Sequence, residues 1–143
     1  MIFGIGVDIV QIERIAAGIR RFGDRLAHRV LTNSEFDEYC GQSRPAAFLA
    51  KRFAAKEAVA KALGHGFRNG VTLRQIGIGH DDYGKPALEY YGAAHNLKEH
   101  LGISDSYISL ADEKCYAIAY VVLMKSRENV AIGQAVIENK PAD

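Results

Sequence analysis

Apolar and small or polar positions alternate along residues 2–10, Ile-Phe-Gly-Ile-Gly-Val-Asp-Ile-Val, and this alternation predicts a β-strand. One face, which we expect to be a core face, carries Ile5, Val7 and Ile9. The other carries Gly4, Gly6 and Asp8. Glycines inside a strand often mark the close approach of another backbone or of a ligand. This second face therefore either accommodates a packed helix, with Asp8 capping a turn, or forms part of a binding site.

Three helical patterns follow. Residues 12–22 place apolar side chains on a predicted buried stripe of Ile12, Ile15, Ala16, Ile19 and Phe22. A capping box, Thr32-Asn33-Ser34-Glu35, predicts a short helix over residues 33–40. Pro45 suits the first turn of a long central helix that runs to about Leu63 and ends at Gly64.

The second half of the domain reads mainly as strands. We expect a strand over residues 71–80, a hairpin turn over 81–85, a return strand over 86–90, a helix over 91–101 and strands over 105–111 and 115–124. Residues 116–124 are almost wholly apolar, so their strand should be central and buried on both faces. Residues 1–125 thus form one predicted domain. The tail over 126–143 changes from polar to apolar and back, and it carries no functional prediction.

Composition narrows the class of protein. The chain has 143 residues and a net charge of +1, which suits one domain and gives no overall field for nucleic acid. Cys40 and Cys115 are isolated, as expected in a reducing cytoplasm. The apolar N-terminal run is short and has no basic leader, and no segment reaches the length of a membrane span.

Residues 52–64, Arg-Phe-Ala-Ala-Lys-Glu-Ala-Val-Ala-Lys-Ala-Leu-Gly, are the most informative part of the long helix. Helical spacing places on one stripe Phe53, Glu57, Ala60, Lys61 and Gly64. A carboxylate and an ammonium group one turn apart, between an aromatic and small side chains, could serve an active site. They could equally form an ordinary i,i+4 ion pair worth a few tenths of a kcal/mol.

Cations gather on and around this helix. Its basic residues, with Glu57 as their one acidic companion, are Arg44, Lys51, Arg52, Lys56 and Lys61. Such a surplus suits a polyanion such as several phosphates. The glycine-rich loop over residues 64–70 could offer backbone N–H groups to phosphate, or could simply end the helix. A second basic group is either a solvated face or a dock for an acidic protein: Arg14, Arg20, Arg21 and Arg25.

Asp8 and Glu57 are carboxylates on faces that are otherwise small or cationic. If the glycine face of the first strand packs beside the Glu57 stripe, the two carboxylates converge. Two carboxylates, completed by water and phosphate oxygens, are a usual way of holding Mg²⁺. Metal, polyphosphate and surrounding cations together indicate phosphoryl-type transfer.

Three segments carry a resemblance to a known family. They run from Gly4 to Ile15, with the sequence Gly-Ile-Gly-Val-Asp-Ile-Val, from Phe48 to Gly64, with Lys-Arg-Phe-Ala-Ala-Lys-Glu-Ala-Val-Ala-Lys, and from Gly84 to Pro86. In this order, over residues 1 to about 125, they resemble the holo-[acyl-carrier-protein] synthases, the short type of 4′-phosphopantetheinyl transferase. The resemblance implies an α+β fold, with an antiparallel sheet packed against a long central helix, and a homotrimer with active sites between subunits.

The family's reaction would move 4′-phosphopantetheine from coenzyme A to a serine of apo-acyl carrier protein, in support of fatty acid synthesis. By matching position, Asp8 and Glu57 would bind Mg²⁺, Glu57 would help to deprotonate the serine, and Lys61 would neutralise the departing phosphate. The residues implied around coenzyme A, besides Lys61, are Arg52, Phe53, Lys56, Gly64, Gly66, Arg68, Asn69, Lys85 and Pro86. The acidic carrier would meet the arginines at positions 14, 20, 21 and 25.

One departure from the family concerns a frequent Ser-His pair, whose place is taken here by Ala111-Asp112. The role of that histidine does not transfer, and Asp112 stays outside the predicted site. Two other classes of function remain open at this stage. Another Mg²⁺-dependent phosphoryl-transfer enzyme or phosphohydrolase would also use two acids and cations. A non-enzymatic module with basic helices would leave Asp8 and Glu57 without a role.

Overall fold

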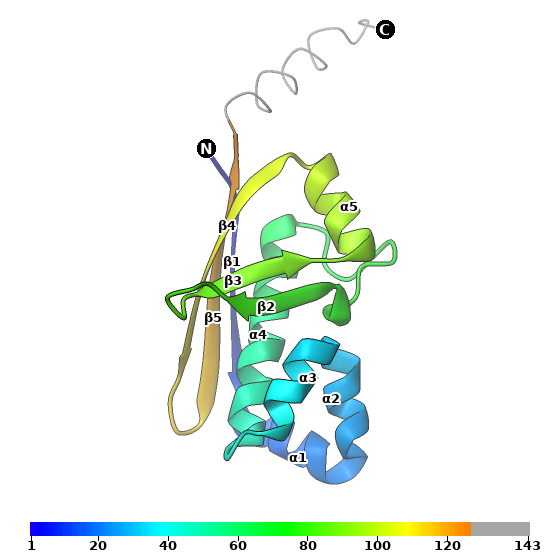
Figure 1. Cartoon of the computed structure of the whole chain (residues 1–143), viewed down its shortest axis with the longest axis vertical. Coiled ribbons are helices and arrows are strands. Elements are labelled where there is room, and N and C mark those ends of the chain that lie inside the picture. The colour runs from blue at the N-terminus through cyan, green and yellow to red at the C-terminus, as the bar shows by residue number, and fades with distance from the viewer. Residues whose placement is uncertain (127–143) are drawn as a thin grey trace, which may run out of the picture.

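A three-stranded antiparallel sheet lies along one long helix in the computed structural model, which describes residues 1–126 (Figure 1). The strands are β1 (Ile2–Gln11), β4 (Ile103–Asp112) and β5 (Tyr116–Lys125), in the order β1-β5-β4. The helix is α4 (Pro45–Leu63), and the predicted α+β architecture is confirmed. Residues from 127 onward, which hold nearly all of the predicted tail, lie outside the described part of the chain.

Three short helices gather at one end of α4, and a hairpin crosses it (Figure 1). The helices are α1 (Ile12–Phe22), α2 (Asp24–Val30) and α3 (Asn33–Cys40). The hairpin is β2 (Ile76–His80) with β3 (Pro86–Tyr90), preceded by the 3₁₀ turn η1 (Leu73–Gln75) and followed by α5 (Gly92–His100). The expected strand over 71–80 is thus wrong in its first half, because Thr72 and Gln75 cap each other across η1. Helix α2 was not predicted, because its seven residues are too few for a clear period.

The face of β1 that was expected to be buried in the core is exposed, and the glycine face is the buried one. The glycine face packs on α4: a Cβ placed on Gly4 would overlap the carbonyl oxygen of Ala62, and one on Gly6 would overlap that of Ala58. The face expected in the core is open instead, with Ile5, Val7 and Ile9 exposed by 57%, 49% and 62%. The strand needs glycine because only a backbone without side chains can approach the helix this closely.

Strand β5 is central, as predicted, but it is buried on one face only. Ala117, Ala119, Val121 and Leu123 are fully buried toward α4. The alternate positions Tyr116, Ile118 and Tyr120 remain open on the same side as the exposed face of β1. The nearly continuous apolar run therefore covers two faces with different surroundings. No helix within residues 1–126 is long and apolar enough to cross a membrane.

Candidate active site

The contact between β1 and α4 brings together the three residues predicted to do the chemistry. Asp8 lies on the glycine face of β1, and Glu57 and Lys61 lie one turn apart on α4. The Lys61 ammonium Nζ donates to Asp8 Oδ1 at 2.9 Å and to the Val7 carbonyl oxygen at 2.9 Å. Within residues 1–126 the ion-pair partner of Lys61 is therefore Asp8 rather than Glu57, which removes the simple i,i+4 pair considered from the sequence.

The electrostatics of the site centre on Glu57. Partial burial raises the pKa of its carboxyl group above the ordinary value, the negative charge of Asp8 raises it further, and Lys61 acts in the opposite direction. Two carboxylate groups at one place, with the ionisation of Glu57 disfavoured by the charge of Asp8, form a site with an affinity for a cation. Among residues 1–126 no third histidine, cysteine or acid completes a cluster. A metal ion here would take its remaining ligands from water or substrate, as Mg²⁺ commonly does.

Most of the cations on α4 are neutralised by acids distant in the sequence. Lys51 Nζ lies 3.1 Å from Asp112 Oδ1. Arg52 lies 3.7 Å from Glu35 and 3.6 Å from Glu38, and it is only 4% exposed. These basic side chains are therefore not available to bind phosphates, because they already form ion pairs with acidic residues of α3 and β4. The sequence of the helix alone does not show these partners.

Lys56 occupies the most buried of these positions. Its side chain has no exposed surface, and its Nζ donates to Glu35 Oε1 at 2.6 Å. Burial lowers the pKa of Lys56, and the Glu35 carboxylate opposes that shift. This location contradicts the expectation that Lys56 lies beside coenzyme A, because an ammonium group without exposed surface cannot meet an entering phosphate.

Glu35 is the structural centre that the sequence did not reveal. It is 2% exposed and accepts hydrogen bonds from the backbone N–H of Thr32 at 2.8 Å and of Ile78 at 3.1 Å, besides the one from Lys56. Its capping role in α3 was predicted and is confirmed. Its role as the partner of α4 had no local signal, because those contacts join segments more than twenty positions apart.

The glycine-rich loop turns back immediately after the stripe of α4 that carries Glu57 and Lys61. Gly64 ends α4 with φ +78°, and Gly66 and Asn69 also adopt positive φ, at +60° and +54°. Arg68 Nε donates to the His65 carbonyl oxygen at 3.0 Å, which folds this side chain along the loop. Phe53 is half-buried on the same stripe as Glu57. The loop thus lies one helical turn beyond Lys61.

Lys85 and Pro86 are not part of this cluster within one chain. Both residues lie where the β2–β3 hairpin turns, and Lys85 Nζ is 5.7 Å from the ring centre of Tyr107 on β4. Strand β4 is separated from β1 by β5, so the predicted hairpin residues lie across the sheet from Asp8.

The predicted docking arginines lie on α1 and α2. Arg20 binds Glu13 at 2.6 Å, and the Arg21 guanidinium stacks 5.0 Å from the ring centre of Phe22, while Arg14 is exposed. Phe22, expected in the buried stripe of α1, is instead 45% exposed. Beside it lies a hollow of about 300 Å³, lined by Phe22, Arg25, Leu26 and Arg29.

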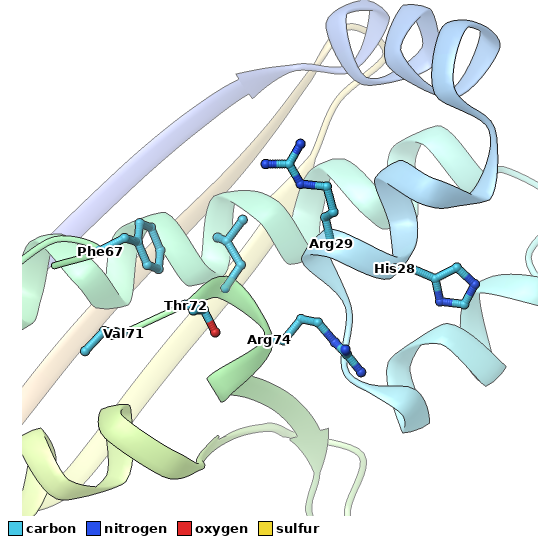
Figure 2. A pocket seen from close by; sticks show the side chains of 7 residues that line it. His28, Arg29, Phe67, Val71, Thr72 and Arg74 are labelled. Atoms are coloured by element: carbon cyan, nitrogen blue, oxygen red, sulfur yellow. The ribbon is translucent and has the colours of Figure 1, made fainter. Parts of the chain in front are cut away.

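Arg29 also lines a second hollow, of about 570 Å³, between α2 and η1 (Figure 2). Its lining is His28, Arg29, Phe67, Val71, Thr72, Leu73 and Arg74. Figure 2 shows Arg29 between Phe67 and His28, with Arg74 reaching in from η1. Neither hollow has an acidic side chain in its lining, so together they form a basic and apolar surface beside the docking arginines.

Comparisons with known proteins give the family of the chain. Residues 4–121 match the family model described as the 4′-phosphopantetheinyl transferase superfamily. The holo-[acyl-carrier-protein] synthase of Nitrosococcus oceani is 51% identical over 133 residues, which cover 93% of this chain and 86% of that protein.

Solved structures give the same result. The crystal structure of holo-[acyl-carrier-protein] synthase from Neisseria meningitidis superimposes with a TM-score of 0.83 at 47% identity, covering 87% of this chain and 100% of that one. The Bacillus anthracis enzyme, in complex with coenzyme A (3′,5′-ADP), has a TM-score of 0.73 at 36% identity, covering 88% of this chain and 99% of that one. The chain therefore belongs to the 4′-phosphopantetheinyl transferase superfamily and, within it, to the holo-[acyl-carrier-protein] synthases.

Proposed function

We propose that this protein transfers 4′-phosphopantetheine from coenzyme A to a serine of apo-acyl carrier protein, in the cytoplasm and in support of fatty acid synthesis. The observation that carries the proposal is the convergence of Asp8, Glu57 and Lys61 where β1 packs on α4. It is supported by relatives named holo-[acyl-carrier-protein] synthase and by a related structure that holds coenzyme A.

The metal proposed at this site is Mg²⁺, held by Asp8 and Glu57. The residues fit the ion, because both offer hard oxygen ligands. The pKa of Glu57 is raised by burial first and by the charge of Asp8 second, and a dication would relieve that repulsion. When bound, the ion would supply electrostatic stabilisation of the phosphate charge during transfer.

The protein's own groups then have distinct tasks. Glu57 accepts the proton of the serine hydroxyl, directly or through water, which frees the serine oxygen to attack the β-phosphorus of coenzyme A. The bond from that phosphorus to the bridging oxygen breaks, and adenosine 3′,5′-bisphosphate leaves with the electron pair. Lys61 is 54% exposed, so its ammonium group can reach a phosphate oxygen and neutralise the charge that develops there.

Coenzyme A itself would extend from Lys61 along the glycine-rich loop. The N–H groups of Gly64 and Gly66 already donate to the carbonyl oxygens of Lys61 and Ala60, so these glycines would shape the loop rather than bind phosphate. Arg68 and Asn69 would meet the phosphates, and Phe53 would offer apolar contact. Arg52 is buried and ion-paired, so we assign it to the support of the site rather than to direct phosphate contact. Asp112 pairs with Lys51, which accounts for that acid without a metal.

The basic surface on α1 and α2 would receive the carrier protein. Arg21 and Arg25 are exposed and lie beside apolar Phe22 and Leu26, a combination suited to an acidic partner that also buries apolar side chains. Arg14 is exposed earlier on α1. Arg20 is already paired with Glu13, so its contribution should be the smallest of the four.

A homotrimer would cover the open face of the sheet. That face gathers large apolar side chains from all three strands, each at least 40% exposed in one chain: Ile5, Val7, Ile9, Tyr107, Tyr116, Ile118 and Tyr120. An exposed apolar area of this extent marks an interface between proteins. Association through it would allow Lys85 and Pro86 of one chain to approach the Asp8 site of another, which they do not reach in their own.

The test is incubation with coenzyme A, Mg²⁺ and apo-carrier protein, followed by intact-mass spectrometry of the carrier. The expected result is a gain of one phosphopantetheine group, with no gain in a carrier variant whose acceptor serine is alanine. Bisphosphate release with an unchanged carrier mass would instead show a phosphohydrolase. Tight metal-independent binding without turnover would show a binding module.

A further inference from the structure

Two basic side chains hold the C-terminal end of α2. Lys56 Nζ donates to the carbonyl oxygen of Val30, the last residue of α2, at 2.6 Å. Arg74 Nε donates to the carbonyl oxygen of Leu31, the next residue, at 3.1 Å. Both carbonyls lie at the helix end, where partial negative charge collects and cations stabilise it. These two bonds fix α2 to α4 and to η1.

Each of the two cations is itself held by a second contact. Lys56 is tied to the buried carboxylate of Glu35 at 2.6 Å, and Arg74 Nη2 donates to Asn33 Oδ1 at 2.9 Å. Glu35 also accepts the backbone N–H of Ile78. We call this network of Glu35, Lys56 and Arg74 the α2 clamp. It joins α2, α3, α4 and β2 through groups with defined directions.

The α2 clamp connects two parts of the proposed reaction. Lys56 precedes Glu57 directly in α4, so a single peptide bond joins the residue that holds α2 to the residue that would hold the metal. Helix α2 carries Arg25 and Arg29, which line the two hollows beside the docking surface. Any shift of α2 along α4 would therefore move a docked carrier, and its serine, relative to Glu57.

We propose that Lys56 is a positioning residue and that the α2 clamp sets the distance between the docking surface and the Glu57 carboxylate. This inference rests on the proposed function and assigns Lys56 a task that its burial allows. Replacing a whole buried ion pair by well-packed apolar residues is often neutral or stabilising, so stability alone does not explain the pair of Lys56 and Glu35, although removing Lys56 alone would leave Glu35 buried without its counter-charge. The Lys56 ammonium group does more than fill space, because its hydrogen bonds to the Val30 carbonyl oxygen and to Glu35 fix the position of the C-terminal end of α2 relative to α4.

The main test variant is Lys56→Met, which keeps an unbranched side chain, one atom shorter, and removes its hydrogen bonds. We expect kcat for apo-carrier protein to fall by about 10- to 100-fold, as for displaced reacting groups. The Kd of coenzyme A, measured by calorimetry, should stay within about twofold, because Lys56 does not face the coenzyme. All measurements are made below the unfolding midpoint of each variant.

The matched control is Ile103→Ala, on β4 beside α5, which removes buried apolar volume away from the α2 clamp. Both variants should lower Tm by several degrees, but only Lys56→Met should lower kcat. A second variant, Arg74→Lys, keeps a positive charge and loses the two-point contact, and its exposed position makes folding secure. It should lower kcat by roughly threefold or more at unchanged salt dependence.

Three results would overturn the proposal. One is a Lys56→Met enzyme that turns over the carrier like the wild type. If Lys56→Met does not fold, the same result with Arg74→Lys has this meaning. The second is an equal loss of coenzyme A affinity and carrier turnover. The third is an equal loss of kcat in Ile103→Ala. If the wild-type protein left the carrier mass unchanged, the proposed function itself would be refuted. Failure of the proposed function is thus distinguishable from failure of the positioning role of Lys56.

Discussion

Substitution of Gly6 by alanine should open the contact on which the active site depends. A Cβ on Gly6 would overlap the Ala58 carbonyl oxygen and would lie 2.9 Å from Ala58 C and 3.0 Å from Ala62 N, whereas ordinary contact begins at 3.4 Å. All of these atoms belong to the backbone of α4, so no side chain can rotate away. β1 must retreat from the helix by on the order of 1 Å, because the interior is close-packed.

Two losses should follow from that shift. Overpacking of this kind costs about 1–3 kcal/mol of unfolding free energy, which corresponds to a fall in Tm of roughly 3–10 °C for a chain of this size. A displacement of Asp8 from Glu57 and Lys61 by on the order of 1 Å should lower the rate of carrier modification by roughly 100-fold. Calorimetry gives the first quantity, and the rate of the mass change in the carrier gives the second.

Gly41→Ala is the matched control. Gly41 ends α3 with φ −92°, and a Cβ there would meet its nearest atom, Glu38 O, at 3.6 Å. This variant should keep wild-type stability and activity. If Gly6→Ala also kept both, the close approach of β1 and α4 would not hold the site together. If only its Tm fell, the spacing would matter for folding but not for catalysis.

Four further outcomes are expected. Glu57→Gln should abolish most carrier turnover in a folded protein, and full activity would remove Glu57 from the mechanism. In metal-free protein the same substitution should raise Tm at neutral pH, because the raised pKa of Glu57 means that its ionised form disfavours folding. That gain in Tm should vanish as pH falls below about 4.3, where the Glu57 carboxyl is protonated in both the folded and the unfolded protein. A gain in Tm independent of pH would show that ionisation of Glu57 is not its cause. Arg21→Glu should weaken carrier binding more than coenzyme A binding, most clearly at low salt, whereas equal losses for both ligands would argue against docking at α1. Ile118→Lys should convert the proposed trimer to monomers in sedimentation experiments, and an unchanged assembly would place the interface elsewhere.

The main helices and strands were predictable because their signals are local. The capping box of α3, the proline that opens α4 and the αL glycine that closes it all lie where the sequence predicts them. The sequence made the convergence of Asp8 with Glu57 conditional on the packing of the glycine face of β1 beside α4, and that condition is met.

The errors have a common cause in long-range contacts. The sequence does not say which apolar face of β1 a helix will cover, and the glycine face proved to be the buried one. The sequence likewise shows Lys56 only as one of several cations on α4. Its ion-pair partner, Glu35, lies on α3 and is not apparent from the sequence of α4. The charge of a helix read alone is therefore a poor guide to the charge that a ligand meets once the fold has paired its side chains.

We propose that Asp8 and Glu57 support a metal-dependent transfer to a carrier serine. The most direct measurement is the intact mass of an apo-carrier protein incubated with coenzyme A and wild-type protein, with Mg²⁺ in one sample and a chelator in the other. We predict the gain of one phosphopantetheine group with Mg²⁺ and almost none with the chelator. A carrier whose mass is unchanged with Mg²⁺, or equally increased in both samples, would contradict the claim.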